Sequence, residues 1–259
     1  MNIASPNTIP AGISAEEWDI RCDLAALYRL VAHHKMTDLI YTHISARLPG
    51  PDHHFLINHY GVMFHEMRAS DLVKIDLDGN VVEQEGLSGR VVNRAGFTIH
   101  SAVHMARDDL KYVIHTHTAA GIAVSAQEHG LLPISQHALK FYGHLAYHGY
   151  EGVALDLDER ERLVADLGPH KAMILRNHGL LVAGTTVQEA WHLIYFLERA
   201  CQAQVAALAG GAKLVLPPEE VRLKTSRQTG PTDPTKPHIQ LAWDASLRMI
   251  ENDAPNYRG

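Results

Sequence analysis

Cysteine is scarce in this chain, which has only two among its 259 residues. Cys22 and Cys201 both fall in segments whose apolar spacing predicts helices. We therefore interpret them as buried free thiols of a protein from a reducing compartment, and not as a disulfide. Stability must then come from a hydrophobic core. The 46% of hydrophobic residues is ordinary for a globular protein, and the length fits one large domain or a main domain with an appendage.

Long apolar runs and basic patches are also missing. No stretch approaches the roughly 18 apolar residues of a membrane span, and residues 1–6 have neither the basic nor the apolar region of a signal peptide. The net charge of -6 and the pI near 6.3, with no basic stripe, argue against nucleic-acid binding. We expect a cytoplasmic protein that acts on a small-molecule substrate, with no nucleic acid and no membrane as partners.

A glycine-rich loop between a strand and a helix is absent as well, which argues against a nucleotide cofactor. Apolar periodicity instead predicts helices that alternate with short, half-buried strands. The first helix is predicted to start at residue 14, and further helices are predicted for 93–107, 119–127, 158–167, 186–208 and 239–252. The predicted strands are 42–48, 55–57, 72–76, 111–117, 171–175 and 180–183. This pattern predicts an α/β fold of three layers, α/β/α, around a central, mostly antiparallel mixed sheet.

The chain divides into three parts by composition, and it contains no internal repeats. Residues 1–13 are punctuated by proline and glycine and are expected to form an N-terminal arm. Residues 14–216 form the main domain. Residues 217–259 begin with a proline- and lysine-rich strap and end in a helix, and we expect this part to pack on the same domain or on a neighbouring subunit.

Histidine is abundant, at 19 residues, and two motifs place it in a pattern typical of metal sites. His115 and His117 flank Thr116 at the end of an apolar strand, where residues two apart point to the same side. His178 follows in Arg176-Asn177-His178-Gly179. Three histidines and a vacant position are the ligand set of a catalytic divalent ion. The alternative is that a His-x-His pair arose by chance or serves the core.

From about residue 14 to 225 the chain resembles the class II aldolase/adducin family. The resemblance rests on segments in the same order: 42–47, 54–58, 70–76, 92–102, the His-Thr-His pair and 175–180. It implies an α/β/α fold with an antiparallel-rich sheet and a homotetramer with active sites at subunit boundaries. It also implies a divalent metal ion on His115, His117 and His178, with zinc favoured and manganese, cobalt or iron as alternatives.

Two departures from the family pattern bear on activity. Sugar-phosphate aldolases of the family carry a glutamate, which binds the metal and transfers protons, four residues before the counterpart of His100; this chain has Gly96 there. The Ser-Gly and Ser-Ser pairs of the family's phosphate cradle align with Tyr60-Gly61 and Arg94-Ala95. The chain is thus closer to the adducin-head branch, which lacks the glutamate. A phosphorylated sugar is accordingly disfavoured as substrate.

Without that glutamate, another group must move protons if the chain is an enzyme. We predict His100 or Tyr60 in this role, with His59 as a further candidate, because a tuned imidazole is the commonest proton-transfer group near neutral pH. Arg94 is predicted to bind a substrate carboxylate, since arginine pairs with carboxylates in a bidentate manner. Packed helix histidines and a surface arginine are the plain alternatives. Weaker candidates from position alone are Glu83, Glu85, His104, His238 and Tyr257.

Three functions remain open from the sequence. The first is a metal-dependent carbon–carbon lyase, aldolase-like or decarboxylating, acting on a small oxygenated substrate that can bear a carboxylate. The second is a non-catalytic adducin-type binding or scaffold domain of the kind associated with the actin cytoskeleton. The third is an iron-dependent oxygenase that uses the same three histidines. The retained ligands favour an enzyme, whereas Gly96 favours the scaffold.

Overall fold

A single seven-stranded sheet lies at the centre of the structure, a computed structural model that describes residues 9–82, 89–153, 156–230, 236–253 and 256–259. The strand order is β3-β2-β1-β4-β7-β6-β5. Only the β5–β6 pair is parallel, and the other five neighbouring pairs are antiparallel. The strands are β1 (His43–Arg47), β2 (Phe55–Ile57), β3 (Val73–Ile75), β4 (Tyr112–Thr116), β5 (Leu145–His148), β6 (Ala172–Leu175) and β7 (Gly179–Gly184). The predicted mostly antiparallel sheet is confirmed.

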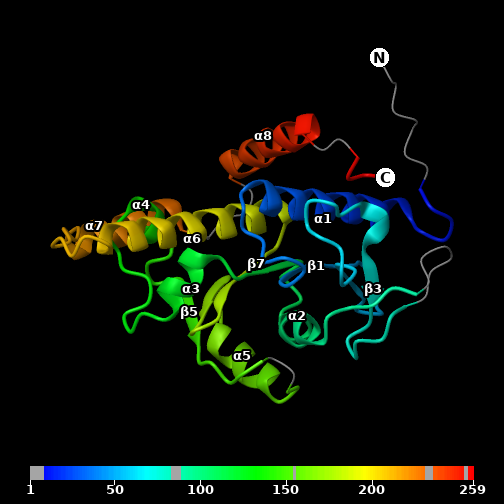
Figure 1. Ribbon diagram of the computed structural model, residues 1–259, viewed down its shortest axis with the longest axis horizontal. Coiled ribbons are helices and arrows are strands. Elements are labelled where there is room, and N and C mark those ends of the chain that lie inside the picture. Colours follow the sequence, from blue (N-terminus) through cyan, green and yellow to red (C-terminus); the bar gives the residue numbers. More distant parts are fainter. Residues whose placement is uncertain (1–8, 83–88, 154–155, 231–235, 254–255) are drawn as a thin grey trace.

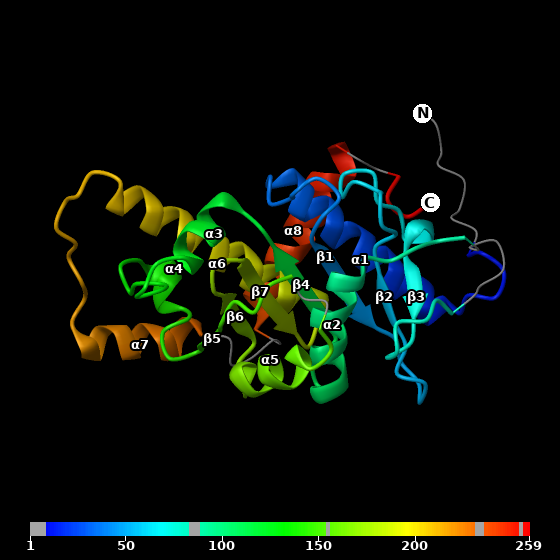
Figure 2. The ribbon, with the colours of Figure 1, turned by 60° about the horizontal axis from the view of Figure 1, so that its bottom comes forward.

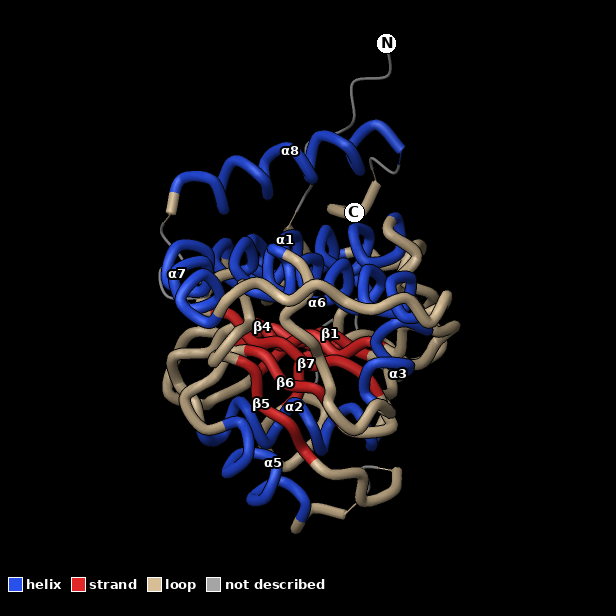
Figure 3. The backbone as a smooth tube through the Cα atoms, turned by 90° about the vertical axis from the view of Figure 1, so that its left-hand side faces the viewer, coloured by secondary structure: helices blue, strands red, loops and turns tan. Residues whose placement is uncertain are grey.

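Helices cover both faces of the sheet (Figure 1). One face carries α1 (Ala15–His33) and α6 (Val187–Leu208), and the other carries α2 (Arg94–Ala106) and α5 (Glu159–Leu167). This confirms the α/β/α layering. Figure 3 shows one further helix, α8 (Pro237–Asp253), stacked outside α1 and α6. The remaining described helices are η1 (Ala69–Asp71), α3 (Ala119–Ser125), α4 (Gln136–Leu139) and α7 (Glu219–Thr229).

The first helix forms where its sequence predicts. Ser14 is its N-cap, and the Ser14 hydroxyl accepts a hydrogen bond from the backbone N–H of Glu17 at 3.1 Å. The apolar positions Leu24, Leu27 and Leu30 recur at helical spacing and are fully buried against the sheet. Burying each such leucine contributes roughly 1.5–3 kcal/mol.

Strand alternation divides the interior into cores on the two sides of the sheet. Ile44 and Ile114 belong to the core beneath α1 and α6, whereas Val113 belongs to the core beneath α2 and α5. His43 and Ser45 therefore face α2, because successive side chains of a strand point to opposite faces. Polar side chains of β1 are in this way placed against the inner face of α2.

Two parts of the chain differ from the prediction. The strap at 217–237 contains α7, which lies with α4 at one end of the molecule (Figure 2). Strand β5 was not predicted, because it is only four residues long and too short to show a clear period. Most of the predicted N-terminal arm lies outside the described residues. Among the helices that are described, none is long and apolar enough to cross a membrane.

Candidate metal centre

The three predicted ligand histidines lie together at one end of β4. Ring nitrogens of His115, His117 and His178 all lie within 4.8 Å of one another. The Nε2 atom of His117 is 2.8 Å from Nε2 of His115 and 2.9 Å from Nε2 of His178. His115 is the fourth residue of β4, and His117 lies just beyond the end of this strand. A local motif and a distant turn thus converge on one point.

His178 lies at the tip of the hairpin that joins β6 to β7. The preceding residue, Asn177, has φ of 55°, a left-handed conformation that asparagine adopts more readily than most residues. A Cβ atom on the following residue, Gly179, would collide with the backbone oxygen of Thr116. Glycine therefore allows the hairpin to approach β4 closely. The Asn-His-Gly order has a direct structural reason in this turn.

The outer ring nitrogens of His115 and His117 are held by hydrogen-bond acceptors. His115 Nδ1 donates to the backbone oxygen of Leu180 at 2.9 Å, and His117 Nδ1 donates to Asp38 Oδ2 at 3.1 Å. With the proton on Nδ1, each Nε2 carries a lone pair that points toward the shared centre. Adjacent lone pairs repel each other unless a cation lies between them. The donor set and its outer acceptors therefore fit a divalent metal ion.

Burial keeps the imidazoles of His115 and His178 uncharged by lowering their pKa values. The pKa of His115 is lowered well below its ordinary value by burial and by the neighbouring His43, His178 and His117. Burial, followed by His117 and His148, lowers the pKa of His178 to about 4. Neutral imidazole is the form that binds a metal, so near pH 7 these rings do not have to lose a proton before binding.

His43, which the sequence reasoning left unassigned, lies beside the three histidines. Its strand position is paired with His115, and the two rings are 5.1 Å apart between centroids. His43 Nδ1 is hydrogen bonded to His100 Nε2 at 2.8 Å. Ser45 Oγ joins His100 Nδ1 to His104 Nε2, the latter at 2.8 Å. A buried hydrogen-bonded chain thus runs from the metal centre into the interior between β1 and α2.

The candidate catalytic residues lie in two different places. His100 is fully buried, and among the described residues His43 links it to the three histidines. Tyr60 and Arg94 lie near each other, because the backbone N–H of Tyr60 bonds to the oxygen of Val91 close to the start of α2. Arg94 is exposed. In the described part of the chain, no hydrogen bond or ring contact joins Tyr60 or Arg94 to the three histidines.

The weaker candidates are also placed, apart from Glu83 and Glu85, which lie outside the described residues. His104 is 1% exposed and is bonded to Ser45. Tyr257 is buried near the C-terminus, where its backbone oxygen accepts a hydrogen bond from Ala69. The ring of His238 lies beside His192 of α6. Within this chain, no described contact links His238 or Tyr257 to the metal centre.

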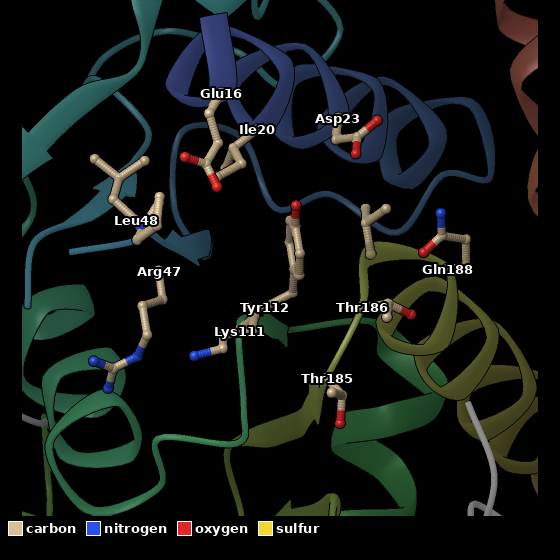
Figure 4. Close-up of a pocket in the computed structure, with 12 residues that line it drawn as sticks. Glu16, Ile20, Asp23, Arg47, Leu48, Lys111, Tyr112, Thr185, Thr186 and Gln188 are labelled. Carbon is tan, nitrogen blue, oxygen red and sulfur yellow. The ribbon is translucent and has the colours of Figure 1, made fainter. Parts of the chain in front are cut away.

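A separate cavity of about 320 Å³ lies at the opposite end of β1 and β4. Figure 4 shows Tyr112 pointing toward α1, between Glu16 and Asp23, with Arg47 at the lower left. Asp23 is largely buried, and burial followed by the neighbouring Asp19 raises the pKa of its carboxyl group to about 6, against a smaller opposing effect of Arg258. The cavity is distinct from the histidine centre, since it opens on the face of the sheet that carries α1.

Comparison with known proteins agrees with this arrangement. The family described as "Class II Aldolase and Adducin N-terminal domain" matches residues 22–205. The chain belongs to this family. The crystal structure of an aldolase II superfamily protein from Pseudomonas syringae is 54% identical and has a TM-score of 0.90; the match covers 95% of this chain and 98% of that one.

Two further relatives represent the two branches of the family. The L-fuculose 1-phosphate aldolase from Glaciozyma antarctica PI12 is 29% identical with a TM-score of 0.82, and the match covers 98% of both chains. Rat alpha-adducin is 43% identical over 90% of this chain, but the match covers only 33% of that protein. The family and the fold expected from the resemblance are both confirmed. The relatives themselves include a protein named as an aldolase and one named as an adducin.

Sequence reasoning missed His43 and Asp38. A signal for His43 exists in two overlapping periods. His43, Ser45 and Arg47 alternate along one strand, while Gly96, His100 and His104 recur every four residues along a helix. These two stripes face each other in the structure. Asp38 had no such signal, because it lies in an irregular loop before β1.

Proposed function

We propose that this protein is a divalent-metal-dependent carbon–carbon lyase, aldolase-like or decarboxylating, that acts on a small oxygenated substrate. The observation that carries the proposal is the convergence of His115, His117 and His178, whose inner nitrogens face one another. The outer nitrogens of His115 and His117 are engaged by acceptors. Zinc suits three imidazoles and an open position, although manganese, cobalt and iron accept the same ligands.

A metal ion held by these residues would supply Lewis acidity for the negative charge that develops on a substrate oxygen when a carbon–carbon bond breaks. The chain's own residues would hold and orient it. Leu180 and Asp38 fix two of the three rings, and the hairpin with Asn177 and Gly179 presents the third. Preorganised ligands of this kind require little rearrangement during the reaction.

The groups that move protons remain part of the proposal. His100 is proposed to act through His43, because the two rings share a hydrogen bond and only His43 lies beside the ligands. Tyr60 and Arg94 are proposed to contact the substrate from the loop beside the start of α2. Arg94 is exposed, and among the described residues it forms no ion pair. Its guanidinium is therefore available to a substrate carboxylate.

We also propose a cytoplasmic homotetramer, as the family resemblance implies. Exposed apolar side chains lie close to residues of the proposed metal centre, one in sequence and one in space, and they are the kind that an adjacent subunit covers. Leu39 is 63% exposed and follows Asp38, while Tyr150 is 55% exposed with its ring 6.2 Å from that of His178. The mass of the purified protein in solution reports the assembly directly.

Metal content per chain tests the proposal. Protein purified without chelator and without a histidine tag should contain about one zinc or related ion per chain. The double variant His115→Ala/His178→Ala should lose the ion, whereas the exposed control His129→Ala should retain it. Elemental analysis gives the readout.

The same measurement separates the alternatives. Iron as the bound metal would direct the search toward oxygenase activity. A wild-type protein that contains no metal, and takes up none on dialysis against Zn²⁺ or Mn²⁺, would overturn both enzyme proposals. That result would support the scaffold function, which the 43% identity to alpha-adducin favours.

A further inference from the structure

Position 96 has no room for a side chain while His43 is in place. A Cβ atom built on Gly96 would lie 2.5 Å from Cδ2, 2.8 Å from Cγ and 3.0 Å from Nε2 of His43. The optimal separation of non-bonded carbon atoms is about 3.5–4.0 Å, so these distances are steric overlaps. The His43 imidazole therefore occupies the space that any residue other than glycine would need at position 96.

The His43 ring cannot move aside cheaply. It is 4% exposed, and its hydrogen bond to His100 continues through Ser45 to His104. His100 and His104 are 0% and 1% exposed, so breaking the chain would leave buried polar atoms without partners. The backbone before the ring is also constrained, because Thr42 has φ of 68°, which is unusual for a β-branched residue.

The packing of His43 against Gly96 leaves neutral side chains around the position of the proposed metal ion. The ligands His115, His117 and His178 carry no negative charge, and an imidazole at the wall adds none. Among the described residues, the carboxylate bonded to a ligand is that of Asp38, on the outer nitrogen of His117. A divalent ion held here would keep most of its positive charge toward the open side.

We propose that His43 is the specificity-determining residue of this centre. By filling the space at position 96, His43 prevents an aspartate or glutamate there from binding the metal. The metal's positive charge is then available to a carboxylate of the substrate. The substrate class is a small 2-oxo or 2-hydroxy acid, which binds a metal through one carboxylate oxygen and the neighbouring oxygen. The inference deepens the proposed lyase function and rests on it, but its steric half can be tested without metal or activity.

The steric half predicts a reversal of sign. Gly96→Ala in the wild-type chain should lower the melting temperature by roughly 2–10 °C, because the added methyl group overlaps His43. In a His43→Ala background the same substitution should raise the melting temperature, because the space is free and alanine favours a helix more than glycine does. Gly96→Ala that is harmless beside His43 would overturn the proposal.

The charge half compares two variants of matched shape. Gly96→Glu/His43→Gly and Gly96→Gln/His43→Gly are loaded with zinc, and the binding of oxalate is measured by calorimetry. The glutamate variant should bind oxalate at least roughly tenfold more weakly than wild type, while the glutamine variant keeps its affinity, since only the former adds a negative charge. Equal affinity in the two variants would overturn the proposal.

The outcomes distinguish this inference from the lyase proposal. Failure of wild-type protein to bind zinc or any other divalent metal ion contradicts the lyase proposal. Metal binding without a preference for oxalate over neutral hydroxyacetone contradicts the role of His43 alone. If the double variants do not fold, the Gly96→Ala pair and the wild-type comparison of oxalate with hydroxyacetone still decide both halves.

Discussion

Asp38 holds the outer nitrogen of His117, a proposed metal ligand, although Asp38 belongs to no helix or strand. Its carboxylate accepts a hydrogen bond from His117 Nδ1, which fixes both the tautomer and the orientation of the ring. In the same loop, Lys35 and Leu39 have positive φ values of 56° and 49°. These positions are costly for residues other than glycine, so the loop geometry is maintained by contacts of this kind.

Asp38→Asn should weaken zinc binding by roughly 10–100-fold, because the amide cannot supply the negative charge that makes the imidazole a stronger donor. Competition with a chromophoric chelator measures the dissociation constant. Asp52→Asn, at an exposed position in the turn between β1 and β2, is the matched control and should bind zinc like wild type. Unchanged affinity in Asp38→Asn would show that the hydrogen bond only restrains the loop.

At the residue scale the sequence predicted that His115, His117 and His178 lie together, but it did not predict their neighbours. His115 and His117 lie two residues apart on a predicted strand, so their convergence follows from local geometry. The role of His43 depends on its contact with Gly96, which is made only when β1 packs against α2. His100 could be named as a candidate from the sequence, but its full burial could not be predicted, because that depends on the same packing.

The β6–β7 hairpin is the element that brings the third ligand to the centre. Gly179 lies against the backbone of Thr116, and the ring of His117 is within 3.2 Å of the position of a Cβ atom there. The hairpin is also secured by Arg176, whose guanidinium donates to the oxygen of Gln127 at 2.7 Å and stacks over Tyr147. The approach of this hairpin to β4 therefore sets the spacing of the ligands.

Gly179→Ala should push the hairpin away from β4. The expected result is a loss of about 1–3 kcal/mol in the free energy of unfolding, together with much weaker zinc binding, because overpacked atoms must shift. Gly149→Ala is the control, since a Cβ atom at Gly149 meets nothing within 4 Å. Chemical denaturation and zinc titration give the two readouts. A Gly179→Ala variant that binds zinc normally would contradict this account.

Helices and strands were predicted correctly where the apolar period extends over many residues. The helix predicted for 186–208 is observed as Val187–Leu208 with Thr186 as N-cap. Short β5 and the polar helix α7 were missed for a common reason. Each depends on tertiary contacts, β5 through its pairing with β6 and α7 through its packing against α4. Neither carries a strong period of its own, since α7 is exposed along most of its length.

The stability of the whole molecule should depend on pH through Asp23. Burial raises the pKa of its carboxyl group from 3.8 to about 6, so the folded protein holds this proton more tightly than the unfolded chain does. Folding is therefore favoured at low pH by this group, and that stability is lost as pH rises from about 4 to about 6. Above pH 6 the folded protein contains a largely buried carboxylate.

Asp23→Asn should accordingly stabilise the protein at pH 7.5 by roughly 2 kcal/mol and have little effect near pH 4, where aspartic acid is already protonated in both states. Thermal unfolding at the two pH values is the measurement. Asp78→Asn, on the exposed turn after β3, provides the control. A stabilisation of the same size at both pH values would point to packing and not to charge.

The contact between His43 and Gly96 also constrains how sequences of this type can change. A single step from glycine to a larger residue at position 96 meets the imidazole, and loss of the imidazole first leaves a hole beside the metal ligands. Each single variant is therefore less stable than the chain with His43 and Gly96 and less stable than the chain in which both residues are replaced. A change from glycine to a larger residue at position 96 thus requires a compensating substitution at position 43, because either substitution alone lowers stability.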